Sequence, residues 1–155
     1  MKKASLLREA VKTRFYPLAL ERGFVRGLAT SLMTPFHRIS GDRVHWFEIQ
    51  WDKYHRPFFV LNFSEFSVAE AGGVTTAPAL FPPATVSRDG IGRLQRKKGG
   101  SLSGWFRLKK PLSWQLLTLQ RYYSPDEVAD QLIEAFEELE AWWENGTEGL
   151  HICFM

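Results

Sequence analysis

Two alternating segments, 36–40 and 43–51, constrain the fold most, because they predict a pair of antiparallel strands joined by a tight turn. The dipeptide Gly41-Asp42 between them tolerates the positive φ angles of a two-residue hairpin turn. This turn sets a register in which Arg38 faces His45. The sequence therefore predicts a hairpin in this part of the chain.

A third strand is expected at 57–66, after a polar turn at 52–56. Residues on both of its faces are apolar, which favours a central position in a sheet over an edge position. Together with the hairpin, this segment predicts an antiparallel meander.

Alternation also divides this sheet into two faces. Along 43–51, the core face carries His45, Phe47, Ile49 and Trp51. The opposite face carries Val44, Trp46, Phe58, Val60 and Phe66. A monomer should not leave so apolar a face exposed, so we expect the chain to cover it or a partner to bind it, with a homodimer as one hypothesis.

Helices are predicted at both ends of the chain. Near the N-terminus, apolar residues recur at helical spacing from Ser5, the expected cap, to Gly23, the expected stop. Pro17 lies inside this pattern and predicts a kink or two abutting helices. The apolar tail 150–155 is expected to add a short strand or to pack against the core.

The second helix has the clearer start signal. Ser124 and Glu127 form a capping box around Pro125, and the dipeptide Asn145-Gly146 is the expected end. The elements together predict an α+β fold, in which the N-terminal and C-terminal helices cover one face of an antiparallel sheet of four or five strands.

The 155 residues suit a single domain spanning 1–155, and an aromatic content of 14% indicates a real core. A long Pro/Gly-rich insertion is expected at about 68–92. The lone Cys153 excludes an intramolecular disulfide framework. Met1-Lys2-Lys3 resembles the start of a signal peptide, but the charged residues Arg8, Glu9, Lys12 and Arg14 interrupt the apolar run that a cleaved signal needs. No apolar run approaches the ~20 residues that span a bilayer, so we expect a cytoplasmic protein without a membrane partner.

The net charge of +3 hides three blocks of opposite sign. Segments 1–26 and 88–110 are strongly basic, whereas 126–148 carries nine acidic residues and no basic one. Two interpretations stay open: the acidic helix neutralises a basic segment of the same chain, or a basic loop is exposed for an anionic partner.

Basic and aromatic residues gather in segment 93–110, a composition typical of nucleic-acid contacts. The candidate residues for an anionic partner are Arg93, Arg96, Lys97, Lys98, Trp105, Arg107, Lys109 and Lys110. The alternative is that Trp105 belongs to the core and the cations to a solvated face.

Catalytic and metal-binding patterns are weak. The four histidines have no paired ligand spacing, and Asp52 with His55 is more typical of a turn than of a catalytic pair. Cys153 has His151 nearby but lies in an apolar tail, as buried structural cysteines do. We therefore expect no cofactor, no metal and no catalytic residues, and predict a non-enzymatic binding or protein-interaction domain, with nucleic-acid binding as the alternative.

The order of elements resembles a bacterial family known as domain of unknown function 4304. The resemblance rests on hydrophobic and structural motifs: Leu18-Ala19-Leu20-Glu21-Arg22-Gly23-Phe24, Phe36-His37-Arg38, Phe47-Glu48-Ile49-Gln50, Ile91-Gly92-Arg93-Leu94, Gly104-Trp105-Phe106 and the capped helix from Ser124. It implies a small α+β domain with a curved antiparallel sheet, and it supplies no activity or catalytic residues.

Overall fold

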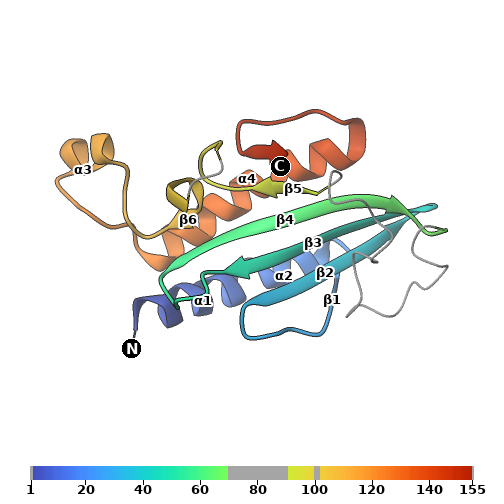
Figure 1. The fold of residues 1–155 in the computed structure, drawn as a ribbon, viewed down its shortest axis with the longest axis horizontal. Coiled ribbons are helices and arrows are strands. Elements are labelled where there is room, and N and C mark those ends of the chain that lie inside the picture. The colour runs from blue at the N-terminus through green and yellow to red at the C-terminus, as the bar shows by residue number, and fades with distance from the viewer. Residues whose placement is uncertain (1, 70–90, 100–101, 155) are drawn as a thin grey trace.

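A single antiparallel sheet with helices along one side forms the body of the protein (Figure 1). The computed structural model describes residues 2–69, 91–99 and 102–154. The strands are β1 (Val25–Arg26), β2 (Met33–Ser40), β3 (Arg43–Trp51), β4 (Phe58–Ser67), β5 (Gly92–Leu94), β6 (Phe106–Arg107) and β7 (Ile152–Phe154). The α+β class is as predicted.

The sheet has seven strands, where the sequence predicted four or five. Its order is β1-β2-β3-β4-β5-β7, and β6 pairs with β4 beside β5. The tail 150–155 was expected to add a short strand or to pack against the core, and it forms β7; the other short strands, β1, β5 and β6, are only two or three residues long. Segments this short show too little alternation to reveal a strand, which explains the low estimate.

The predicted meander and its register are confirmed. β2 and β3 pair around the Gly41-Asp42 turn with Arg38 opposite His45, and β4 pairs with β3 over its whole length. Gly41 has a φ of 63°, the left-handed region that such a turn needs. β4 is central, because β3 lies on one side of it and β5 and β6 on the other.

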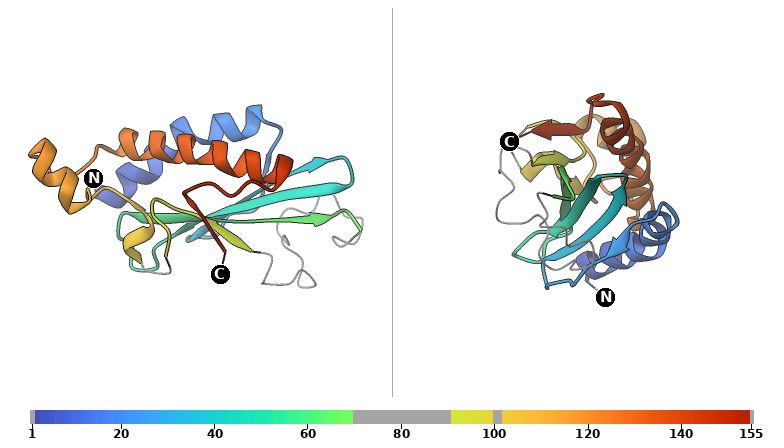
Figure 2. Two further views of the ribbon diagram at one scale, coloured as in Figure 1. Left: turned by 90° about the horizontal axis from the view of Figure 1, so that it is seen from above. Right: turned by 90° about the vertical axis from the view of Figure 1, so that its right-hand side faces the viewer.

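Three helices cover one face of the sheet, as Figure 2 shows. They are α1 (Lys3–Arg14), α2 (Tyr16–Glu21) and α4 (Pro125–Asn145). α1 and α2 abut at Phe15, so the prediction of a break near Pro17 is confirmed. Ser5 is not the cap, because α1 already begins at Lys3.

The capping box of α4 is confirmed on both sides. Ser124 Oγ accepts from the Glu127 amide at 3.1 Å, and the Glu127 carboxylate accepts from the Ser124 amide at 3.4 Å. The helix ends at Asn145, and Gly146 takes a left-handed conformation with a φ of 75°.

The main core lies between the sheet and the helices. The ring of Phe47 on β3 packs against Phe15 near α1, Phe36 on β2 and Phe136 on α4. Trp143 closes the core near the end of α4, where its indole N–H donates to the Ser64 carbonyl at 3.2 Å. These contacts join the two predicted helices to the meander.

The opposite face of the sheet is not exposed as an apolar surface. Val44, Trp46 and Phe66 form a small second core cluster, against which Val68 packs, and Val60 is also buried. Phe58 is half-buried, with the guanidinium groups of Arg56 and Arg107 over its ring. The predicted interaction face is therefore occupied within the chain. The Pro/Gly-rich insertion expected at about 68–92 falls largely outside the described residues.

A short helix, α3 (Leu112–Thr118), follows the 3-10 turn η3 (Leu102–Gly104) and β6. No periodicity or capping signal in the sequence predicts this helix. α3 projects from one end of the molecule, away from the sheet (Figure 1), and none of its seven residues is buried.

Candidate functional site

The acidic face of α4 is largely paired with arginines from the first half of the chain. Arg14 Nη2 lies 3.0 Å from Asp130, and Arg22 pairs with Glu137. Arg38 Nη2 donates to Glu140 at 2.6 Å. Among the ion pairs of the described residues, none involves segment 93–110. The acidic helix thus pairs with Arg14 and Arg22 of the first basic block, and in the described residues it forms no ion pair with the second.

Much of the second basic block serves the fold. Arg93 Nε donates to Asn62 at 3.2 Å, and its guanidinium lies over Trp105, which is only 5% exposed. Arg96 donates to the carbonyls of Lys109 and Ser103. These contacts hold the turns around β6 in place and remove Trp105 from any stacking surface.

Two further cations of this block also bind groups of their own chain, and three are exposed. Arg107 covers Phe58 and donates to the Leu102 carbonyl. Lys110 is buried and donates to Thr118 Oγ1 at 3.0 Å. Burial lowers the pKa of both Arg96 and Arg107. The exposed members of the predicted set are Lys97, Lys98 and Lys109.

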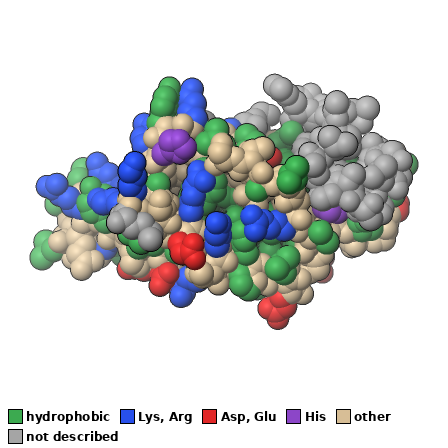
Figure 3. Space-filling model, turned by 90° about the horizontal axis from the view of Figure 1, so that it is seen from below, with side chains coloured by type: hydrophobic (Ala, Val, Ile, Leu, Met, Phe, Trp, Pro, Cys, Tyr) green, Lys and Arg blue, Asp and Glu red, His purple; other side chains and the backbone are tan. Residues whose placement is uncertain are grey.

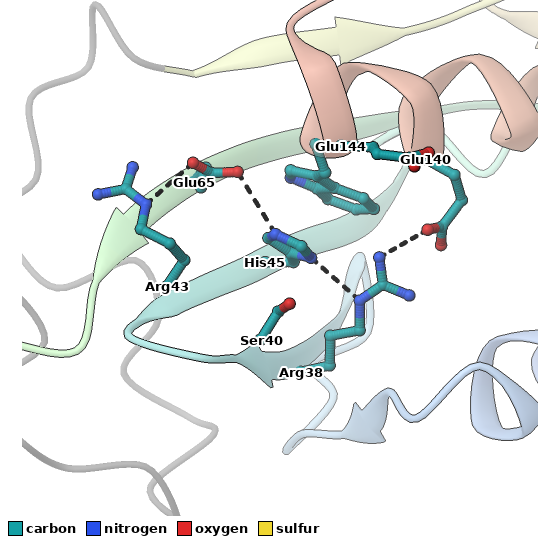
Figure 4. A pocket seen from close by; sticks show the side chains of 8 residues that line it. Arg38, Ser40, Arg43, His45, Glu65, Glu140 and Glu144 are labelled. Atoms are coloured by element: carbon teal, nitrogen blue, oxygen red, sulfur yellow. Dashed lines mark hydrogen bonds and ion pairs between the residues drawn. The ribbon is translucent and has the colours of Figure 1, made fainter.

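A polar hollow of about 440 Å³ lies where β2, β3 and β4 meet the end of α4 (Figure 4). A chain of contacts crosses it. Arg43 Nε donates to Glu65 at 2.9 Å, Glu65 lies 3.4 Å from His45 Nε2, and Arg38 joins His45 to Glu140. The hollow is thus lined by groups that already bind one another.

His45 is held as a neutral ring within this chain. Its Nδ1 accepts from Arg38 Nε at 3.0 Å, which leaves the proton on Nε2, toward Glu65. Burial, with a contribution from Arg38 and Arg43, lowers the pKa of His45 to about 4. The ring also stacks on Trp143 with centroids 4.9 Å apart. Both ring nitrogens are engaged, so the arrangement favours a structural role over proton transfer.

A basic edge of the molecule is visible from below, where Lys and Arg side chains gather over α1 and the adjoining sheet edge (Figure 3). A small hollow of about 110 Å³ lies here between Arg8, Lys12 and Arg26. Arg8 stacks over Trp51 and donates to the Ser31 carbonyl, and Arg26 stacks over Tyr16. The two arginines thus pack onto the body of the protein.

Asp52 and His151 each bind a side chain other than the one with which the sequence suggested a catalytic pair. The Asp52 carboxylate binds the Arg56 guanidinium at 2.9 and 3.0 Å, a contact that lowers the pKa of Asp52, whereas His55 reaches Asp52 through its backbone N–H. His151 pairs with Glu138 on α4. Cys153 lies on β7, half-buried, next to β5.

The most unusual surface of the described chain is the apolar tip formed by α3. It exposes Leu112 (71%), Trp114 (50%), Leu116 (71%), Leu117 (75%) and Leu119 (89%). In a seven-residue helix these side chains point in several directions around the axis, so no single face is apolar. We call these five residues the α3 tip.

Leu119 ends α3 in a left-handed conformation with a φ of 58°. Glycine or asparagine is the usual choice at such a position, because glycine has no Cβ and the Cβ of most other residues costs about 1 kcal/mol there. Since the Leu119 side chain is nearly fully exposed, this residue contributes little packing to offset that cost. Both features favour a role for Leu119 outside its own chain.

A groove of about 510 Å³ lies beside the tip, between α3, α4 and β6. Its apolar lining comes from Phe106, Pro111, Trp114, Tyr123 and Ala135. Gln131, Glu134 and Glu138 line it from successive turns of α4, and Arg96 and His151 complete the wall.

Sequence reasoning missed both the tip and the groove. The signal available was four leucines and a tryptophan within eight residues, flanked by cations.

Searches of protein-family models, of curated proteins and of solved structures found no match for this chain. The resemblance to domain of unknown function 4304 therefore stays a prediction. Within the described residues, no helix has the length and apolar character to cross a bilayer. The same residues hold no cluster of three or more His, Cys, Asp or Glu side chains that could bind a metal ion.

Proposed function

We propose that this protein is a non-enzymatic protein-interaction domain that docks through the α3 tip. The observation that supports it most is the exposure of three leucines and a tryptophan on a helix that buries none of its own residues, with a fourth exposed leucine at its C-cap. Covering an exposed leucine completely is worth roughly 1.5–3 kcal/mol, so a partner that buries the tip gains substantial free energy. Leu119 supports the same proposal, because its position costs the fold free energy without adding packing.

The charges around the tip define the partner. Lys109 and Arg121 flank α3, and both are exposed. Between Ile91 and Pro125 the sequence has no acidic residue. A complementary surface is an apolar groove edged by carboxylates, so the binding mode is that of a short helix in a groove. The predicted partner is a protein of this kind.

Nucleic-acid binding remains the second candidate and rests on three exposed lysines, Lys97, Lys98 and Lys109. A phosphate-binding surface can be built from such side chains. The burial of Trp105 and Lys110 leaves fewer groups for base stacking or phosphate contact than the sequence predicted. Leucines on the tip match a protein groove better than a phosphate backbone.

Site-specific photo-cross-linking in living cells tests the proposal. A photoreactive amino acid at Leu117 should give a discrete protein adduct, whereas the same group at Leu28, which is 74% exposed elsewhere, should not. Lys109→Glu/Arg121→Glu should reduce the adduct if the acceptor has an acidic edge. Adducts with lipid or nucleic acid alone, or no difference between positions 117 and 28, would overturn the proposal.

A further inference from the structure

We infer that the partner of the α3 tip is a second copy of this chain, which receives the tip in its groove between α3, α4 and β6. This inference rests on the proposed function, because it names the partner of the same docking helix. Each copy would supply one tip and one groove, so the contact is made twice.

The groove has the chemistry that the tip requires. Phe106, Pro111 and Ala135 provide an apolar floor, and a volume of about 510 Å³ accommodates leucine side chains rather than the whole helix.

One carboxylate of the groove complements the cations that flank the tip. Asp130, Glu137 and Glu140 of α4 already bind arginines of their own chain, and Glu138 contacts His151. Glu134 lines the groove, is exposed and takes part in none of these ion pairs. Lys109 or Arg121 at the base of an incoming tip can neutralise it.

The placement of tip and groove favours a two-fold symmetric pair. Trp114 belongs to the tip and also lines the groove, so the tip and the groove are contiguous at one end of the molecule. A two-fold axis through this end brings each tip to the other copy's groove at once.

Sedimentation of the full chain over a range of concentrations tests the dimer. We expect a species of twice 17.9 kDa. Leu116→Ser/Leu117→Ser should raise the dimer dissociation constant about tenfold or more, without a change in the circular dichroism spectrum, because both side chains are exposed. The matched control, Leu28→Ser/Leu150→Ser, removes two equally exposed leucines elsewhere and should leave the dimer intact.

A charge exchange tests the groove. The E134R chain and the K109E/R121E chain should each dimerise about tenfold more weakly than the wild type, since like charges then meet in both contacts. Mixed together, they should form a heterodimer, because each contact regains opposite charges. A dimer that survives the leucine substitutions, or separate variants that dimerise normally, would overturn the assignment.

The two proposals fail in different ways. A chain that stays monomeric at every concentration overturns the self-association. If Leu117 then still cross-links to another protein in cells, docking through α3 stands and only the identity of the partner changes. If the monomer instead binds vesicles of anionic lipid through α3, both proposals fall.

Discussion

Arg38 Nε donates a 3.0 Å hydrogen bond to Nδ1 of His45. This buried histidine is neutral, whereas the side chains bound to it are charged. The charged groups facing it are Arg38, Arg43 and Glu65, and Trp143 of α4 covers its ring. A proton on His45 would break the Arg38 contact and place a third cation between two arginines. The folded state therefore resists protonation of this ring.

Acidification should destabilise the protein through His45. Its pKa is about 4 in the folded chain against an ordinary value of 6.5, so the unfolded state binds more protons between these values. The free energy of unfolding should fall as the pH drops from 6.5 to 4, by up to about 3 kcal/mol. Urea unfolding across this range measures the effect.

His45→Gln supplies the control for this titration, because glutamine offers a neutral acceptor and donor without a titrating ring. Its unfolding free energy should depend less on pH than that of the wild type between pH 6.5 and 4. Equal pH dependence in the two proteins would show that His45 does not carry the effect.

Glu140→Gln should lower the free energy of unfolding by about 1–2 kcal/mol, because Arg38 would keep its half-buried position but lose its carboxylate partner. Glu144→Gln, on the exposed rim of the same hollow, should change it by less than about 0.5 kcal/mol. Thermal unfolding of both variants provides the comparison. Equal effects would mean that the ion pair contributes nothing to the fold.

The Phe63 ring lies so close to the backbone of Gly92 that only glycine fits at this position without a shift. A Cβ at this position would lie 2.4 Å from Phe63 Cζ, so Gly92→Ala should cost about 1–3 kcal/mol of stability. Gly92→Ala/Phe63→Leu should be less destabilised than the sum of the two single changes, because the smaller side chain relieves the overlap. Additive losses would argue against this contact.

A change at Leu119 should affect folding stability and dimerisation in opposite directions. Leu119→Gly should leave the stability of the chain unchanged or raise it by up to about 1 kcal/mol, since glycine adopts the left-handed conformation without strain. The same change removes the most exposed leucine of the tip and should weaken the dimer. Urea unfolding at low protein concentration, together with sedimentation, checks both effects. A loss of stability with normal dimerisation would reverse our interpretation of this residue.

The sequence correctly predicted those turns, helix starts and helix breaks that are marked by a few neighbouring residues. The Gly41-Asp42 turn fixed the register of Arg38 and His45, and the Ser124 capping box marked the start of α4. Pro17 predicted the break between α1 and α2. In each case the determining residues are adjacent in the sequence, so a single chain suffices to recognise them.

The site was harder to predict because its features depend on tertiary contacts. Periodicity identifies a helix over several turns, and α3 is only seven residues long, with leucines at 112, 116 and 117 and a tryptophan at 114. Arg96 and Arg107 appear in the sequence as free cations, yet both bind backbone carbonyls of neighbouring turns. The burial of Val44 and Trp46 likewise cannot be derived from strand alternation alone.

Hydrogen–deuterium exchange of the full chain at two protein concentrations tests the central claim most directly. The amides of α3 should exchange more slowly at the concentration that favours the dimer, and so should those of α4 around Glu134. The exposed turn at 53–56 should exchange equally at both concentrations and serves as the internal control. Identical exchange of α3 at both concentrations, in a sample that sedimentation shows to be dimeric, would contradict the claim that copies associate through this helix.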